Sequence, residues 1–276
     1  PEQARLMGRI YQKTKVHNRG SVLLANEADG DVNRKRLSFY GTESPGTAER
    51  MQAFGEHAGE LALQAAREAL NDSCLTPSRI THLVTVSCTG FQSPGVDLFL
   101  IDKLGLSAAV QRTHVGFMGC HGALNGLRVA HAFAEMDPSA VVLLCAVELC
   151  SLHMSYGWHP EQVVANALFA DGAAAVVGSA GPPMSDRNLV LKGSGSIVIP
   201  NSADLMHWEI GDRGFSMGLS PLVPAAVGAA LLPWLQDWLQ VRAVDLSEIR
   251  SWAVHPGGPK ILSTCAEALG LDPELL

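Results

Sequence analysis

The stretch that decides the fold is VGFMGCHGALNGLRVA, residues 115–130, in which a cysteine stands between glycines where an apolar strand gives way to an apolar helix. Gly119 and Gly122 allow a sharp backbone turn on either side of Cys120. The run that follows has too few polar residues for a surface helix, so we expect a buried helix that starts at the cysteine. Free N–H groups and the helix dipole there lower a thiol pKa from about 8.5 to roughly 3.5–7.5. The stretch predicts a thiolate nucleophile at Cys120; a small buried hydrophobic residue is the alternative.

A second stretch, WAVHPGGP at residues 252–259, supplies a partner for the cysteine. His255 ends a short apolar run and enters a Pro/Gly loop, and Pro259 is placed to open the next helix. A histidine at the end of a strand is held rigidly. Cys120 and His255 lie far apart in the sequence, but a Cys/His nucleophile pair requires only that they meet in space.

Apolar patterns around these stretches predict an α/β fold whose sheet is covered on both faces. Strands are expected at 80–88, 141–148, 173–178, 189–199 and 249–254, and helices at 47–71 (with a kink near Gly55 or Gly59), 96–104 and 222–240. Residues 149–164 lack periodicity and are interpreted as a loop over the site. A Pro/Gly-rich linker at 180–186 divides the chain into residues 1–180 and residues 181–276.

Composition narrows the class of protein. With 276 residues, 47% hydrophobic and 17% charged, the chain can bury a substantial core. It has neither an unbroken apolar span of membrane length nor a signal peptide, so we expect a cytoplasmic protein without a membrane span. Its six cysteines form no C-x-x-C pair, which argues against a zinc site or a disulfide framework. A net charge of −7 disfavours nucleic acid as a partner.

The N-terminal segment has a net positive charge, opposite to that of the whole chain. The first nineteen residues hold five basic residues against one acid, Glu2. Arg5, Arg9 and Lys13 follow at intervals of four, so they share one face of a helix. Such a face can receive a phosphorylated ligand, and a merely solvated helix face is the alternative.

The Cys and His stretches, together with ALFADGAAA at 167–175 and Gly214-Phe215, resemble the type III polyketide synthases, the chalcone synthase family. The resemblance runs along the whole chain. It implies a thiolase-like five-layer α-β-α-β-α architecture of two similar halves, a homodimer, and coenzyme A thioesters as substrates with no tightly bound cofactor or metal. The VELCSL segment at 147–152 is most similar to the bacterial alkylpyrone and alkylresorcinol branch.

The resemblance also implies roles for individual residues. In family terms, Cys120 and His255 are catalytic, and Phe169 and Phe215 stand between the coenzyme A tunnel and the polyketide cavity. Glu148, Ser151 and His153 fall where family members line that cavity; a hydrogen-bonded loop histidine is the alternative for His153. Arg9 and Lys13 match positions that contact coenzyme A phosphates, while Leu6 stands where a lysine is common.

The implied reaction loads an acyl group on Cys120 and extends it with the enolate formed by decarboxylation of malonyl-CoA, followed by cyclisation to a pyrone or resorcinol-type product. Two alternatives stay open: a ketoacyl synthase III-like condensing enzyme, and a non-catalytic acyl-CoA-binding fragment. The HPGGP sequence that begins at His255 argues against the ketoacyl synthase III-like enzyme, which is the first alternative. The second is motivated by the family's Gly-Asn-x-Ser motif and first strand, which we do not find, so we expect the fold to be incomplete at both ends.

Overall fold

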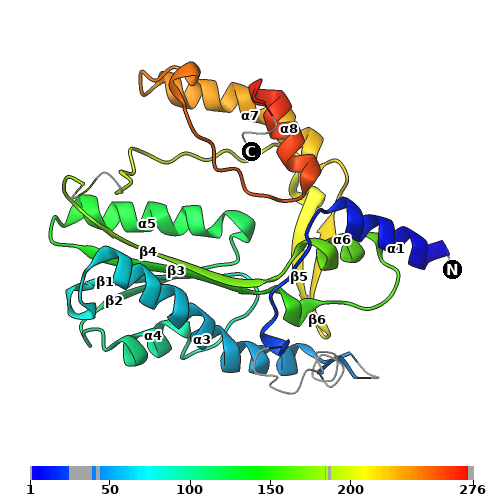
Figure 1. The fold of residues 1–276 in the computed structure, drawn as a ribbon, viewed down its shortest axis with the longest axis horizontal. Helices are drawn as coiled ribbons and strands as arrows, with labels where there is room; N and C mark the ends of the chain where they lie inside the picture. The colour runs from blue at the N-terminus through cyan, green and yellow to red at the C-terminus, as the bar shows by residue number, and fades with distance from the viewer. Residues whose placement is uncertain (1, 25–38, 42–43, 184, 186–187, 273–276) are drawn as a thin grey trace.

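The chain folds as an α/β structure, seen in a computed structural model that describes residues 2–24, 39–41, 44–183, 185 and 188–272 (Figure 1). The α-helices are α1 Glu2–Lys13, α3 Thr47–Ser73, α4 Val96–Leu104, α5 Gly122–Met136, α6 Pro160–Leu168, α7 Val223–Gln240 and α8 Pro259–Leu269. The strands are β1 His82–Ser87, β2 Gln111–Gly116, β3 Val141–Leu149, β4 Asp171–Ser179, β5 Met206–Gly211 and β6 Gly214–Leu219. The connections within the described residues include the short 3-10 helices η1 Val22–Leu24, η2 Pro77–Arg79, η3 Gly119–His121, η4 Cys150–His153, η5 Ala203–Leu205 and η6 Leu246–Glu248.

The central sheet has the strand order β2-β1-β3-β4. β1 is parallel to both β2 and β3, whereas β4 runs antiparallel to β3. The helices α4 and α5 make the crossovers that parallel neighbours require. The predicted strands at 80–88, 141–148 and 173–178 are confirmed, and every residue of β1 is buried.

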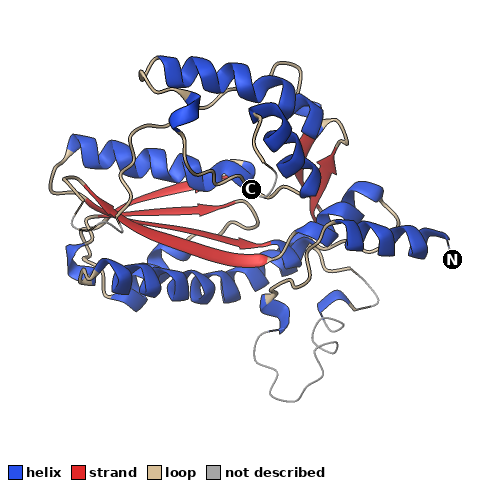
Figure 2. Cartoon of the chain, turned by 45° about the horizontal axis from the view of Figure 1, so that its top comes forward, coloured by secondary structure: helices blue, strands red, loops and turns tan. Residues whose placement is uncertain are grey.

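Helices cover both faces of this sheet, as expected (Figure 2). α3 and α4 pack on one face, and α5 packs on the other against β1 and β3. α3 is one continuous helix that neither Gly55 nor Gly59 interrupts. Gly59 instead allows close packing, since a Cβ atom there would lie 2.7 Å from the Phe99 ring.

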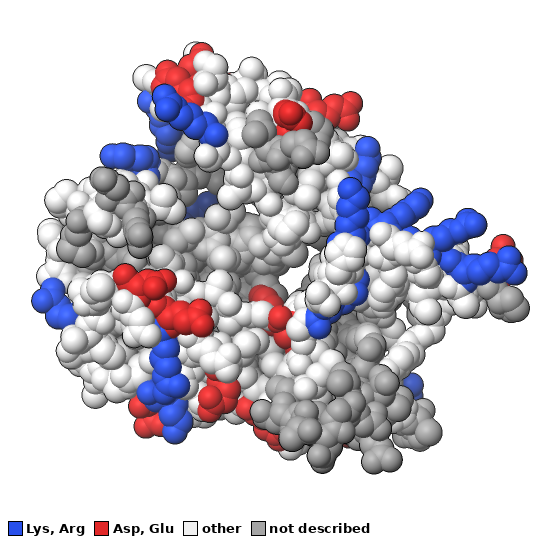
Figure 3. All heavy atoms as spheres, viewed as in Figure 1, with Lys and Arg blue, Asp and Glu red and all other residues white. Residues whose placement is uncertain are grey.

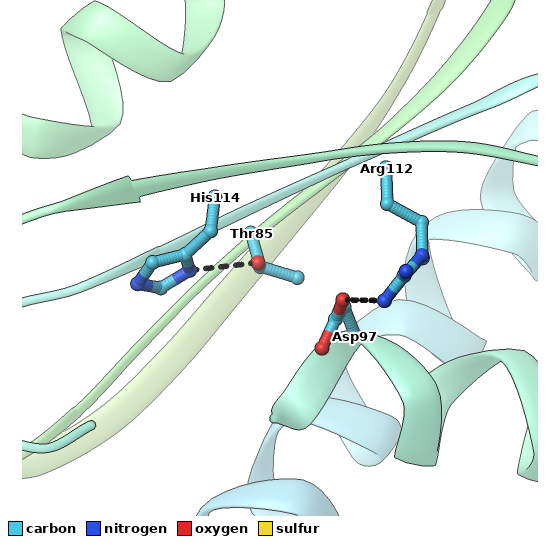
Figure 4. A network of polar contacts seen from close by, with 4 residues as sticks. All are labelled: Thr85, Asp97, Arg112 and His114. Carbon is cyan, nitrogen blue, oxygen red and sulfur yellow. Dashed lines mark hydrogen bonds and ion pairs between the residues drawn. The ribbon is translucent and has the colours of Figure 1, made fainter. Parts of the chain in front are cut away.

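The edge strand β2 is anchored by two polar contacts (Figure 4). The Thr85 hydroxyl of β1 lies 2.9 Å from His114 Nδ1. Arg112 Nη1 donates to Asp97 Oδ2 of α4 over 2.6 Å. These contacts tie the strand that leads to Cys120 to both its neighbouring strand and the helix below.

The helix after Cys120 is less buried than its sequence predicts. Only Gly122 and Gly126 of α5 are buried, and Leu124 is 62% exposed. The apolar face toward the sheet packs on Val86 and Leu144, while the opposite face is only loosely covered. The expectation of a buried helix was wrong in this structure, because burial requires a second close-packed layer above α5.

The layer above α5 contains two chain segments but no β-sheet. The segments 189–199 and 249–254, expected as strands, run between α5 and α7 without strand pairing (Figure 1). Ser194 of the first segment is held from both sides. Arg128 Nε of α5 donates to its Oγ over 3.4 Å, and Trp238 Nε1 of α7 donates to its backbone oxygen over 3.2 Å. The two strand predictions were therefore wrong here, since strands need neighbours to pair with, although both segments lie in the fourth of the five expected layers.

One further segment corrects the sequence interpretation. The predicted loop at 149–164 contains η4 and the start of α6. The Gly-Phe motif at 214–215 belongs to the β5–β6 hairpin, whose turn docks on the N-terminus of α3. Thr47 N donates to Asp212 O over 2.9 Å, and Gly214 N donates to Thr47 Oγ1 over 2.8 Å. Among the helices described here, none has the length and apolarity needed to cross a membrane.

Candidate active site

Cys120 lies in η3, in the tight connection between β2 and α5. Gly119 adopts a left-handed φ of +65°, which a larger residue adopts only with strain. Gly122 sits where a Cβ atom would come within 2.9 Å of Val86 Cγ1. The two glycines therefore do what the sequence predicts: they fold the chain sharply and bring the cysteine to the carboxyl end of the parallel strands.

The surroundings of Cys120 favour the thiol over the thiolate. Although the residue reaches the protein surface, desolvation by the surrounding protein atoms, followed by the charge of Glu148, raises the Cys120 pKa above its usual value. The Glu148 carboxylate accepts from Cys88 N at 2.9 Å and from Thr89 Oγ1 at 2.7 Å. The predicted lowering of the thiol pKa by the helix start is outweighed in this structure, because the cysteine precedes α5 in a 3-10 turn and faces a negative charge.

The second cysteine near this turn supports the backbone. Cys88 Sγ accepts from Gly119 N over 3.2 Å, one residue before Cys120. Burial raises the Cys88 pKa to about 11, with Glu148 adding to the shift. A neutral Cys88 thiol therefore holds the turn in place.

His255 lies in the loop that precedes α8, which starts at Pro259 as predicted. No hydrogen bond or ion pair joins its imidazole to Cys120 in the described parts of the chain. Gly258 of the same loop has φ +112° and lies against Leu168 at the end of α6. Partial burial lowers the His255 pKa. The lowered pKa favours the neutral imidazole, and the structure does not bring it into contact with the cysteine as the sequence predicts.

A cavity of about 210 Å³ opens beside the site. Three residues predicted from the sequence, Ser151, His153 and Phe169, line it together with Trp208, which the sequence analysis missed. Cys120 and His255 are not on its wall. The structure therefore brings the predicted substrate-binding residues together but places the predicted catalytic pair outside this cavity.

Ser151 is held by the partly buried carboxylate of Asp171. Its hydroxyl donates to Asp171 Oδ2 over 2.6 Å, and its N–H donates to Asp171 Oδ1 over 2.7 Å. Burial raises the Asp171 pKa. Ser21 Oγ donates to Ser151 Oγ over 2.8 Å, so the serine joins η4, β4 and the segment after α1. Asp171 belongs to the LFADG motif, which explains structurally why an acid follows Phe169.

His153 uses both ring nitrogens inside the protein. Nε2 lies 2.6 Å from the Thr89 carbonyl oxygen, and Nδ1 accepts from Phe215 N over 3.1 Å. These partners assign the neutral tautomer with its proton on Nε2. Burial lowers the His153 pKa to about 4. The ring therefore shapes the cavity wall and has no nitrogen left for a ligand.

Phe215 is the centre of an aromatic cluster. Its ring stacks on His153 with centroids 4.1 Å apart and meets Trp208 edge-on at 5.7 Å. The ring centroids of Phe91 and Phe117 lie 6.4 and 6.2 Å from that of Phe215. Trp208 Nε1 donates to Cys88 O over 2.9 Å. An isolated tryptophan in a hairpin carries no sequence signal for such a role, which is why the sequence analysis missed it.

The basic residues gather on α1, as the sequence predicts. Figure 3 shows Lys and Arg side chains clustered over this helix at one end of the molecule. Arg5, Arg9 and Lys13 are all exposed, and α1 buries no residue. Arg19 Nε donates to Ala167 O over 2.9 Å, so the chain after α1 is tied to the end of α6 near Phe169.

A mixed sheet with helices on both faces, and a cysteine turn at the carboxyl ends of its parallel strands, defines the thiolase-like class of condensing enzymes. Within this class the chain belongs to the chalcone and stilbene synthase family, the type III polyketide synthases, because the family's N-terminal domain matches residues 3–182. As predicted, it is therefore a polyketide synthase, an acyltransferase-type enzyme.

Individual relatives agree with this assignment. A Mycobacterium tuberculosis protein described as alpha-pyrone synthesis polyketide synthase-like Pks18 is 32% identical over 278 residues, covering 100% of this chain and 69% of the relative. The C-terminal type III polyketide synthase domain of Steely1 from Dictyostelium superposes with a TM-score of 0.88 at 28% identity, covering 100% of this chain and 76% of that one. The structure of 1,3,6,8-tetrahydroxynaphthalene synthase from Streptomyces coelicolor A3(2) superposes with a TM-score of 0.87 at 27% identity, covering 100% of this chain and 75% of that one.

Proposed function

We propose that this synthase loads an acyl group from a coenzyme A thioester onto Cys120, extends it with units from malonyl-CoA and cyclises the product to a pyrone or resorcinol-type ring. The observation that carries this proposal is the position of Cys120 in a glycine-framed turn at the carboxyl end of the parallel strands. The similarity to an alpha-pyrone synthase-like protein supports the product class.

The proposed loading step is a thioester exchange. Cys120 Sγ forms a bond to the acyl carbonyl carbon, the coenzyme A sulfur leaves, and the cysteine proton passes to His255. Since the pKa of the Cys120 thiol is raised and that of His255 is lowered, a neutral base meets a protonated nucleophile. His255 acts only once its loop brings the imidazole to the thiol.

The proposed extension step begins when malonyl-CoA loses carbon dioxide and leaves an enolate. Protonated His255 donates to the enolate oxygen, as an oxyanion donor does in other acyl-transferring sites. The enolate carbon then attacks the Cys120 thioester carbonyl and releases the cysteine. The chain is thereby lengthened by two carbons and returned to coenzyme A.

Further residues are proposed to bind the substrate. Phe169 and Phe215 separate the approach of coenzyme A from the cavity, whose wall includes Ser151 and His153. Arg9 and Lys13 are exposed on α1 and are proposed to contact the coenzyme A phosphates. No tightly bound cofactor is proposed.

Covalent loading tests the proposal directly. We expect the wild-type protein, mixed with an acyl-CoA, to gain the mass of the acyl group on the peptide that contains Cys120. Cys120→Ala should lose this adduct, whereas Cys74→Ala, which removes another exposed free cysteine, should keep it. An acyl adduct that persists in Cys120→Ala would contradict the assignment of the nucleophile.

We further propose that the enzyme acts as a cytoplasmic homodimer. The support for pairing is β2, which lies at the edge of the sheet and has no buried residue among its six. Sedimentation velocity on the purified protein tests this, and a species with the mass of one chain at micromolar concentration would refute it.

A further inference from the structure

Arg50 is a cation that the proposed chemistry does not use. Its residue is 1% exposed, and no carboxylate among the described residues pairs with it. Nε donates to Pro45 O over 3.0 Å, Nη2 donates to Ser44 Oγ over 2.9 Å, and Nη1 donates to Leu152 O. A buried charge is costly unless fully hydrogen-bonded, so its position is tightly specified.

The Arg50 guanidinium packs directly beneath the β5–β6 turn. Gly214 has φ +101°, and a Cβ atom there would lie 2.6 Å from Arg50 Nε. Gly214 immediately precedes Phe215. The arginine also bonds Leu152, which immediately precedes His153. One side chain thus supports the backbone of both partners in the stacked ring pair.

His153 holds Phe215 from the other side. It accepts the Phe215 N–H, donates to Thr89 O and stacks on the phenyl ring with an interplanar angle of 16°. Arg50 and His153 therefore act on the same two backbone segments, η4 and the start of β6.

Phe215 separates two parts of the site. Toward the nucleophile it contacts Phe117, three residues before Cys120. It also contacts His153 and Trp208, which both line the cavity. A small displacement of this ring changes the passage between the nucleophile and the cavity.

We propose that Arg50 and His153 are positioning residues that together fix the Phe215 ring between Cys120 and the cavity. This inference rests on the proposed function for its catalytic meaning but not for its structural content. A misplacement of about 1 Å costs about 10²-fold in rate at sites that depend on orientation. The two residues are therefore expected to control turnover without contacting the reacting atoms.

The first test follows the ring itself. The protein is labelled with 4-fluorophenylalanine, and the Phe215 resonance is assigned in the fluorine NMR spectrum by its loss in Phe215→Leu. His153→Asn retains an oxygen near the place of Nδ1 and so keeps an acceptor for Phe215 N, whereas His153→Gln extends its amide toward Thr89 and loses that acceptor. We expect the Phe215 resonance to stay close to its wild-type position in His153→Asn and to shift or broaden in His153→Gln.

Arg50 is tested in the same way. Arg50→Met removes the charge and all donors at similar length, and Arg67→Met on the exposed face of α3 is the matched control. We expect Arg50→Met to perturb the Phe215 resonance and Arg67→Met to leave it unchanged. Should Arg50→Met fail to fold, the two His153 variants still decide the proposal.

Activity provides the second readout. For acyl-CoA and malonyl-CoA as substrates, we expect kcat to fall at least about tenfold in His153→Gln and less in His153→Asn, with KM changing little. An unperturbed Phe215 resonance in both His153→Gln and Arg50→Met would overturn the proposal, whatever the melting temperature. If the wild type made no polyketide, the proposed function would fail while the resonance experiment would still test the positioning.

Discussion

The protonation state of Cys120 is decided by its nearest neighbours. A cysteine before a helix is expected to be acidic, yet burial and Glu148 raise the Cys120 pKa. Glu148 stays in place because Cys88 N, Thr89 Oγ1 and Ser87 Oγ all donate to it. The thiol therefore needs a base for activation, which is the part proposed for His255 in loading.

Replacing the acid should make the thiol more reactive. In Glu148→Gln the amide oxygen keeps acceptor bonds while the negative charge is lost, so we expect the Cys120 pKa to fall. Each unit of decrease raises the thiolate fraction about tenfold at pH values below the pKa. The pKa is measured by alkylation with iodoacetamide at a series of pH values from about 7 to about 10, followed by mass spectrometry of the peptide that contains Cys120. An unchanged pH profile, or an equal change in the exposed control Glu248→Gln, would contradict the assigned cause.

At the scale of elements, two glycines allow α5 to pack closely on the central sheet. Gly122 and Gly126 are its buried residues, and a Cβ atom at Gly126 would lie 2.6 Å from Leu144 Cδ1 and 3.0 Å from Val86 Cγ2. The close approach of helix to sheet sets the height of Cys120 above the strand ends. The same seam explains why a helix with an exposed outer face remains attached to the sheet.

We expect Gly126→Val to lift α5 from the sheet. Overpacking of a close contact costs about 1–3 kcal/mol. Ala123→Val, on the exposed side of the same helix, introduces the same branched side chain without the contact and should cost little. Urea unfolding measures both free energies, and equal losses in the two variants would show that helix propensity rather than packing is responsible.

The helix α1 permits a prediction about substrate binding that does not involve the catalytic step. If Arg9 and Lys13 contact coenzyme A phosphates, Arg9→Ala and Lys13→Ala should each raise KM for malonyl-CoA. An exposed charge contact is worth at most about 1 kcal/mol, so the increase should reach at most about fivefold. Turnover should change little, because phosphate contacts bind the ground and transition states alike.

Steady-state kinetics at several salt concentrations check this prediction. Salt screens exposed charges with a Debye length of about 8 Å at physiological ionic strength, so KM of the variants should depend less on salt than KM of the wild type. Arg67→Ala on α3 is the charge-matched control. A fall in kcat at constant KM would mean instead that α1 supports the site by packing.

At the scale of the whole molecule, buried histidine makes stability depend on pH. The His153 pKa falls from 6.5 to about 4 on folding, because burial disfavours the charged ring. Between these values the unfolded chain binds more protons than the folded one, so the free energy of unfolding decreases as the pH falls. The raised pKa values of Glu148 and Asp171 act in the opposite sense, since their folded forms hold protons more tightly.

We therefore expect the wild type to lose stability on acidification from about pH 6.5 to about pH 4, with His153 contributing on the order of 3 kcal/mol. His153→Asn cannot take up this proton and should show a correspondingly smaller loss. Urea unfolding at a series of pH values measures the difference. Parallel curves for the two proteins would contradict the assignment of the titrating group.

The sequence alone was sufficient for features with a local cause. The glycines around Cys120, the apolar runs of β1 and β3, the spacing of basic residues on α1 and Pro259 before α8 all produced the predicted elements. These features depend on backbone freedom, periodicity and capping, which neighbouring residues decide. The motifs carrying the family resemblance are local too, and the comparisons confirmed the family.

Only the tertiary structure decided how distant residues act on one another. It raised the Cys120 pKa through desolvation and through Glu148 of β3, left His255 without a hydrogen bond to the thiol, and gathered Trp208, His153 and Phe215 from separate segments. It also left 189–199 and 249–254 unpaired, although their apolar patterns suit strands. Burial, electrostatic fields and strand pairing each depend on which groups meet in space, and no pattern within a single stretch of sequence contains that information.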